Sequence, residues 1–248
     1  MSFAGKITAV IKVAGTRGGL RALLTWKPFS LTAFRMTQAL RDTVPELRTV
    51  VDAGSNVGQF ARAISSRFPD ADIICFEPVP AVFDLLTRNI ADVARAELHA
   101  YALGDKSGSL AFHINKYSHA SSALEMLPEA KRALPMLGDV QEAVVEIRTL
   151  DDLLGHRELR RPSLLKLDLQ GFELQALRGA QGSVLRSTDY VLVETPFQAS
   201  YVGQPLFDDI YVFLTSAGFK LIGPLDVLTD AQGRYIQADL LFANDGSS

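Results

Sequence analysis

The segment from Val50 to Phe60, VVDAGSNVGQF, joins a short apolar run, an aspartate and two glycines before the chain turns apolar again. Glycine permits positive φ and close backbone approach, and a helix that begins nearby offers unpaired N–H groups. The run before Gly54 predicts a strand, whereas Phe60, Ile64 and Phe68 recur at helical spacing. The segment therefore predicts a strand, a tight turn and a helix, the repeating unit of a parallel α/β sheet.

The rest of the chain continues this alternation. Further strands are expected within residues 71–78, 96–105, 107–114, 143–149, 163–168 and 189–196, and further helices within 81–90, 172–180 and 205–217. Residues 117–142 contain two prolines and fit neither pattern, which predicts an excursion over the sheet edge. The apolar runs at 219–223 and 237–244 predict a terminal antiparallel hairpin, so we expect an α/β sheet that is parallel except at this end.

Composition places the chain among globular proteins. It has 248 residues, 48% hydrophobic and 21% charged, enough for a substantial core. Its single cysteine, Cys75, excludes an intramolecular disulfide, and no Cys/His spacing typical of zinc occurs. No signal peptide and no apolar run of roughly 18 residues is present. We therefore expect a cytoplasmic protein without a transmembrane segment.

The basic residues of the first part of the chain are unevenly placed. Residues 1–41 contain no acid and carry Lys6, Lys12, Arg17, Arg21, Lys27, Arg35 and Arg41. This pattern favours a basic helical extension, residues 1–46, docked on an acidic domain, residues 47–248. It leaves open a peripheral contact with an anionic membrane surface or substrate. A nucleic-acid partner is not expected, because no aromatic-interleaved basic run occurs. The sequence indicates no oligomeric state.

The glycine turn departs from the dinucleotide pattern G-x-G-x-x-G. In the run Asp52 to Gly58, Ser55 and Asn56 follow Gly54, so an asparagine replaces the middle glycine and an aspartate precedes the first. A pyrophosphate would be repelled by that carboxylate, whereas a ligand with an ammonium group and no phosphate would suit it. S-adenosylmethionine is such a ligand.

Acidic residues follow two more strands. Glu77 comes 19 residues after Gly58, where a carboxylate can accept both ribose hydroxyls of an adenosine, and Pro78 fixes the following turn. Lys166 and Asp168 fall on one face of a strand that should be buried. A buried charge needs a partner, so these two either pair with each other or reach a cleft at the strand ends.

Six segments together resemble the FkbM family of S-adenosylmethionine-dependent methyltransferases: VVDAGSNVGQF, FEPVPAVFDLLTRNI, ALGDKSG, TLDDLL, LLKLDLQGFELQALRGA and VLVET. They follow the family's order across about residues 48 to 195, and KLDLQGFELQALRGA is the most specific.

The resemblance implies a class I methyltransferase (Rossmann-like) fold with a seven-stranded, mostly parallel sheet, helices on both faces and a terminal antiparallel hairpin. It also implies O-methylation of a sugar, glycolipid or polyketide-type natural product. The implied cofactor residues are Asp52, Gly54, Ser55, Asn56 and Gly58 for the methionine part, Glu77 and Pro78 for the ribose, Ala102, Leu103 and Gly104 for the adenine, and Asp168 near the sulfonium.

A protonated alcohol is a poor nucleophile, so a positioned base should contribute. Candidates are His119 in the excursion, Asp168 and Glu194 at strand ends, and Glu173, whose charge also suits the start of a helix. Asp168 and Glu194 end neighbouring strands in the expected order and could share Mg²⁺. We do not expect a required metal and predict no metal ligands.

Two other functions fit the same sheet. One is an NAD(P)-dependent oxidoreductase, which the missing middle glycine and the terminal hairpin disfavour. The other is a regulatory module that binds the cofactor without turnover, which an intact turn and Glu77 do not exclude.

Overall fold

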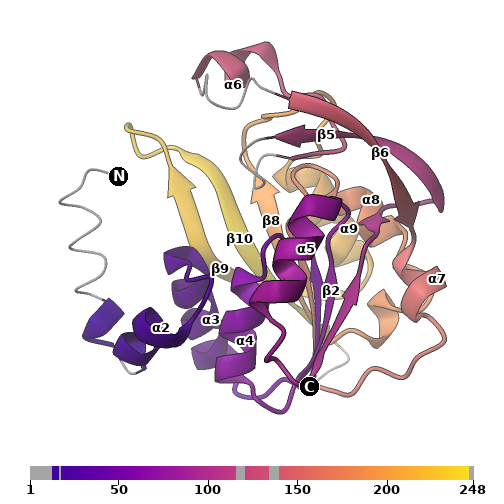
Figure 1. Cartoon of the computed structure of the whole chain (residues 1–248). Coiled ribbons are helices and arrows are strands. Elements are labelled where there is room, and N and C mark those ends of the chain that lie inside the picture. The colour runs from indigo at the N-terminus through magenta and orange to yellow at the C-terminus, as the bar shows by residue number, and fades with distance from the viewer. Residues whose placement is uncertain (1–12, 17, 116–120, 134–139, 246–248) are drawn as a thin grey trace.

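A seven-stranded sheet runs through the molecule in the order β3-β2-β1-β7-β8-β10-β9 (Figure 1). The structure is a computed structural model and describes residues 13–16, 18–115, 121–133 and 140–245. Neighbours from β3 to β8 are parallel, and β10 is antiparallel to β8 and to β9. The strands are β1 (Thr49–Ala53), β2 (Asp72–Phe76), β3 (Ala96–His99), β7 (Ser163–Leu167), β8 (Tyr190–Pro196), β9 (Phe219–Thr229) and β10 (Tyr235–Asn244). The predicted parallel sheet with an antiparallel terminal hairpin is confirmed.

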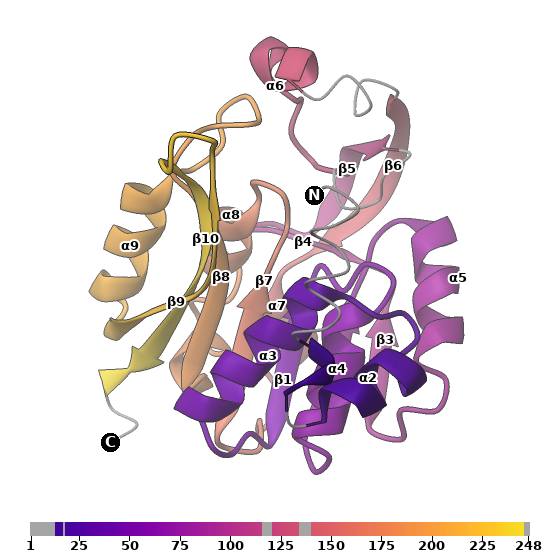
Figure 2. The ribbon, with the colours of Figure 1, turned by 90° about the vertical axis from the view of Figure 1, so that its left-hand side faces the viewer.

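Helices cover both faces of the sheet, as Figure 2 shows. One face packs against α3 (Leu31–Thr43), α4 (Gln59–Arg67) and α5 (Pro80–Asn89), and the other against α7 (Leu150–Leu154), α8 (Glu173–Arg178) and α9 (Phe207–Ser216). Alternate residues of β1 show why: Val50 points into the first core and Val51 into the second. Both side chains are buried, as expected of a strand covered on both faces.

A smaller sheet of three strands, in the order β4-β6-β5, lies beyond the carboxyl ends of the main strands (Figure 1). Its strands are β4 (Ala102–Leu103), β5 (Gly108–Asn115) and β6 (Val140–Arg148). The single strand predicted over residues 96–105 is wrong, because the chain leaves the main sheet after His99 and Ala102 pairs instead with Ile147 of β6. The predicted excursion contains α6 (Pro128–Ala133), and Met126 forms an isolated bridge with Tyr201.

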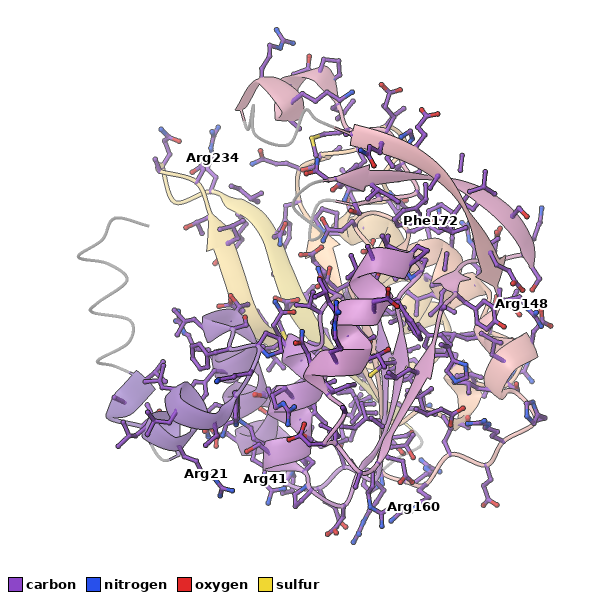
Figure 3. The ribbon with its side chains drawn as sticks, viewed as in Figure 1. Arg21, Arg41, Arg148, Arg160, Phe172 and Arg234 are labelled. Carbon is purple, nitrogen blue, oxygen red and sulfur yellow. The ribbon has the colours of Figure 1, made fainter. Side chains whose placement is uncertain are left out.

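Helices α2 (Gly19–Thr25) and α3 belong to the basic N-terminal segment. Helix α3 contacts α4 and β9, and the Arg67 guanidinium of α4 lies over the rings of Trp26 and Phe34. Figure 3 shows Arg21 and Arg41 at the end of the molecule opposite Phe172. These two cations therefore do not reach the strand-end side of the sheet.

Candidate active site

A cavity of about 450 Å³ opens at the carboxyl ends of β1, β2, β7 and β8. This is where an open α/β sheet binds ligands, because the strand order changes direction between β1 and β7. The N-terminal part of α3 and the small sheet supply the other walls. The cavity therefore lies between the main sheet and the two structures that extend beyond it.

The glycine turn forms the floor of the cavity. Gly54 has φ 79°, and a Cβ there would lie 2.0 Å from the carbonyl oxygen of Asp168, so only glycine fits between the ends of β1 and β7. The N–H groups of Gly54 and Ser55 donate to the carbonyl of Phe76, at 3.1 and 2.9 Å. Gly54, Ser55 and Asn56 line the cavity. The turn thus presents backbone where a ligand would lie, as predicted for these three residues.

Asp52 and Gly58 act elsewhere in the same turn. Asp52 is 0% exposed and its Oδ1 lies 3.1 Å from the Lys166 ammonium, so its carboxylate faces the protein interior. Gly58 has φ 92° and caps α4, and a Cβ there would meet Ile90 at 2.8 Å and Leu86 at 3.0 Å. Neither is among the cavity-lining residues. Contact of Asp52 and Gly58 with the cofactor stays a prediction. In the structure, Asp52 pairs with Lys166 and Gly58 allows α4 to begin against Leu86 and Ile90.

Glu77 follows β2 and holds its carboxylate in the cavity wall, next to Pro78. One oxygen accepts from the N–H of Asn56 at 3.1 Å and the other from the N–H of Val79 at 3.0 Å. Burial to 7% exposure raises the pKa of Glu77 to about 7, although the two N–H donors favour the charged form. Each oxygen keeps a lone pair for a further donor, so the carboxylate can accept two neighbouring hydroxyls.

The turn after β3 closes the far side of the cavity. Ala102 and Leu103 line it together with Tyr101 and Phe172. Gly104 does not line it, since a Cβ there would lie 2.5 Å from Ile147, which places Gly104 in the packing of the small sheet. The apolar and aromatic side chains at this side of the cavity are those of Tyr101, Ala102, Leu103 and Phe172.

Lys166 is the cation of the site. Its Nζ lies 3.1 Å from Asp52 Oδ1 and 3.6 Å from Asp168 Oδ2, and it donates to the carbonyl of Gly54 at 3.1 Å. Burial opposes its charge, but the Asp52 and Asp168 carboxylates raise the pKa of Lys166. Both predicted alternatives therefore hold together: Lys166 pairs with Asp168, and Asp168 also lines the cavity.

Asp168 and Glu194 follow or end adjacent strands, as predicted, and face the same cavity. The side-chain amide of Gln170 bridges them, with Nε2 2.9 Å from Asp168 Oδ1 and 3.0 Å from Glu194 Oε2. Gln237 of β10 donates to the other Glu194 oxygen. Burial, and then the nearby charge of Asp168, raise the pKa of Glu194 well above its usual value. Glu194 is thus a carboxylate prepared to hold a proton.

The other candidate bases have different outcomes. His119 lies outside the described residues, so its role stays a prediction. Glu173 begins α8 and accepts from the N–H groups of Leu169 and Gly171, which confirms its place at the start of that helix. Burial raises the pKa of Glu173 to about 7. It supports the turn that carries Gln170 and does not line the cavity.

Several cavity residues carry no signal in the sequence. Ser30, Thr32, Ala33 and Met36 reach the cavity from the start of α3, and Gln237 reaches it from β10. Ser30 caps α3 by accepting the N–H of Ala33 at 3.2 Å. This N-cap was readable from the sequence as a helix start. That the helix start would face the ends of β1 and β7 depends on tertiary packing.

Two absences concern the described residues only. Within them, no group of three or more His, Cys, Asp or Glu side chains is arranged to hold a metal ion. In the same part of the chain, no helix has the length and apolar character needed to cross a membrane.

Comparison with known proteins identifies relatives. Residues 52–221 match the Methyltransferase FkbM domain. The chain is 30% identical over 162 residues to "Methyltransferase 1" of Beauveria bassiana, covering 60% of this chain and 65% of that protein. It is 26% identical over 201 residues to the 2-O-methyltransferase NoeI of Sinorhizobium fredii, covering 79% of each. It is 30% identical over 145 residues to the hexuronic acid methyltransferase AglP of Haloferax volcanii, covering 58% of this chain and 54% of that protein. The matches thus span from about half to four fifths of these relatives.

The chain also matches solved structures at low sequence identity. A TehB-like SAM-dependent methyltransferase from Corynebacterium glutamicum matches with a TM-score of 0.43 and 12% identity, covering 86% of this chain and 88% of that chain.

The order of the seven strands, with the antiparallel pair β10-β9 at one edge, is that of the class I methyltransferase fold. The cavity at its strand ends is lined by the glycine turn and by Glu77, which follows β2. Since the family match covers most of the sheet and the cavity floor, the chain belongs to the FkbM methyltransferase family.

Proposed function

We propose that the protein is an S-adenosylmethionine-dependent O-methyltransferase that acts on a hydroxyl group of a sugar, glycolipid or polyketide-type natural product. The observation that carries this proposal is one cavity lined both by Gly54 and Glu77, which suit an adenosine-bearing cofactor, and by the neighbouring carboxylates of Asp168 and Glu194. The names of NoeI and AglP, which specify a 2-O-methyltransferase and a hexuronic acid methyltransferase, support a sugar acceptor.

The residues present fit this cofactor. Gly54 leaves room for close approach to backbone, Glu77 offers two acceptor oxygens, and Asp168 and Glu194 give the cavity the negative charge that a sulfonium and an ammonium require. When bound, S-adenosylmethionine supplies an electrophilic methyl group. A nicotinamide dinucleotide would instead place its pyrophosphate among these carboxylates, so the oxidoreductase alternative has no support from the site.

The protein's own part in the reaction is alignment and proton acceptance. When bound, the cofactor would present its methyl carbon in line to the acceptor oxygen and would leave as the neutral thioether, and Gly54, Glu77 and Asp168 are the residues that would hold it there. The hydroxyl proton passes to Glu194, whose raised pKa suits a proton acceptor near neutral pH, with Asp168 beside it. Lys166 neutralises part of the remaining charge. No step in this scheme requires a divalent cation, and we propose none.

The acceptor would meet the wall that α3 provides. Thr32 and Met36 of α3, Phe60 of α4 and Gln237 of β10 also line the cavity. We therefore include residues 1–46 as an N-terminal extension that completes the acceptor side of a methyltransferase domain formed by residues 47–248. The mixture of hydroxyl, amide and apolar groups suits a polyol with an apolar face.

The test has two measurements. Isothermal titration with S-adenosylhomocysteine and with NAD should give binding of the thioether only; tight NAD binding with no response to the thioether would refute the cofactor assignment. Incubation with S-adenosylmethionine and a panel of uronic acids, deoxysugars and macrolactones should release S-adenosylhomocysteine and add the mass of one methylene group to one acceptor. The expected kcat is ~1–10³ s⁻¹, the usual range for enzymes. Cofactor binding without turnover on any acceptor would favour the regulatory module.

A further inference from the structure

Gln170 adopts a backbone conformation that a side-chain-bearing residue rarely takes. It lies between β7 and α8 with φ 52°, in the left-handed region, and Gly171 follows with φ 101°. This region is unfavourable for residues with a side chain, and such strain gathers at functional sites. The Ser122 hydroxyl donates to the Gln170 carbonyl at 2.7 Å and holds the backbone in place. Glycine at this position would remove the strain. The presence of glutamine therefore indicates that its side chain has a role here.

The side-chain amide of Gln170 is fully used. Its two N–H hydrogens have two carboxylate partners, Asp168 Oδ1 and Glu194 Oε2, and its oxygen accepts from the Tyr201 hydroxyl at 3.2 Å. Turning the amide over would put its oxygen against both carboxylates. The orientation is therefore fixed from both ends, by two acceptors on one side and a buried phenol on the other.

We propose that Gln170 is a positioning residue that joins the carboxylates of Asp168 and Glu194 into one proton-accepting unit. The proposal rests on the proposed function only for the direction in which the proton moves. The geometry that supports it is independent of that function, because Gln170 Nε2 lies within 3.0 Å of both carboxylates. Two neighbouring carboxylates repel each other, and a shared pair of charge-assisted N–H donors offsets that repulsion.

The charged and titratable groups that face Glu194 come from every element around it. They are Asp168 and Lys166 on or after β7, Glu173 on α8, Asp239 on β10 and the Tyr201 phenol. Asp168, Glu173 and Asp239 favour a proton on Glu194, and Lys166 opposes it. Against this background, the N–H donors of Gln170, together with that of Gln237, favour the charged form of Glu194 before the acceptor arrives. Removing the Gln170 donors should make the pair hold a proton to higher pH.

The experiment measures protons directly. The full chain is titrated with S-adenosylmethionine and with S-adenosylhomocysteine between pH 6 and 9, in two buffers of different ionisation enthalpy. The sulfonium of S-adenosylmethionine is positive and the thioether of S-adenosylhomocysteine is neutral. The difference in the number of protons released when each ligand binds therefore reports the proton that the carboxylate pair loses beside the positive charge. For Q170L, we expect the proton release to move to higher pH by about one unit. The acid limb of kcat should move with it, while the KM for S-adenosylmethionine stays within about threefold.

Two further variants make the result decisive. Y201F removes the hydroxyl that orients the amide and should move the proton release in the same direction by a smaller amount. Q181L, the same chemical change at an exposed glutamine after α8, should match the wild type. If Q170L does not fold, Y201F decides alone.

Wild-type proton release in both Q170L and Y201F would overturn the proposal, even if activity fell. A shift in both variants would support it. If the shift occurs but no hydroxyl acceptor is methylated by the wild type, the positioning role stands and the proposed function fails.

Discussion

The two halves of the cavity are built by different means. At the ends of β1 and β2, the backbone forms most of the cavity wall and holds its side chain. Gly54 allows close approach, and Glu77 is fixed by the N–H groups of Asn56 and Val79. At the ends of β7, β8 and β10, side chains from separate elements meet, as in the amides of Gln170 and Gln237 on Glu194. The first half depends on local conformation and the second on tertiary packing, so mutations should affect them separately.

The largest effect is expected on the side-chain half. E194Q removes the proton acceptor while keeping the shape of the side chain, and should lower kcat by about 10²–10⁴-fold. Titration with S-adenosylhomocysteine should show a loss of affinity of about tenfold or less, because Gly54, Glu77 and the Asp168 carboxylate remain in the cavity. Loss of cofactor affinity equal to the loss of kcat would show that the two halves are not separable.

The backbone half can be broken at Gly54. G54A adds a Cβ 2.0 Å from the Asp168 carbonyl and should lower the free energy of unfolding by about 3 kcal/mol or more. Gly233 offers a matched control with the same φ of 79° and nothing within 4 Å of an added Cβ. G233A should therefore cost only about 1–2 kcal/mol. If urea denaturation gave the same loss in the free energy of unfolding for G54A and G233A, the close contact between the ends of β1 and β7 would contribute nothing to stability.

Glu77 tests the cofactor half through a side chain whose carboxylate also accepts the N–H groups of Asn56 and Val79. E77A removes acceptors for two hydroxyls and should weaken S-adenosylhomocysteine binding by about 1.5–3 kcal/mol, roughly 10-fold to 150-fold. At saturating S-adenosylmethionine, kcat should stay near the wild-type value. An unchanged affinity by calorimetry would remove Glu77 from the cofactor site.

A further effect is a pH dependence of stability, spread over several pH units. Burial raises the pKa of Glu173 to about 7 in the folded protein, above its usual value of 4.5. Its contribution to stability is therefore complete below about pH 4.5 and is lost as pH rises through 7. The full loss should be about 3 kcal/mol, since the shift is about 2.5 pKa units and one unit corresponds to about 1.4 kcal/mol. E173Q keeps an oxygen for the Leu169 and Gly171 N–H groups, so its melting temperature should fall less between pH 5 and 8.

The same division separates what the sequence predicts from what it does not. Gly54 and Glu77 were predictable because their roles follow from local spacing along consecutive strands. Asp168 and Glu194 were predictable as neighbours because parallel strands end at one edge of the sheet. The bridge made by Gln170, the approach of Gln237 and the wall from Met36 depend on packing between distant segments. The small sheet was also missed, since β4 has only two residues and is a strand only because β6 lies beside it.

Helix α3 also has a consequence for the order in which the cavity forms during synthesis. It leaves the ribosome before the sheet, yet it contacts β9, which is made after all the parallel strands. A nascent chain that has finished β8 can already hold the glycine turn and Glu77 in place. The wall that would select the acceptor can pack on α4 earlier, but it gains its contact with β9 and the side chain of Gln237 only once the hairpin has been made and has docked. A chain interrupted before β9 would therefore retain the glycine turn and Glu77 and lack part of the acceptor wall.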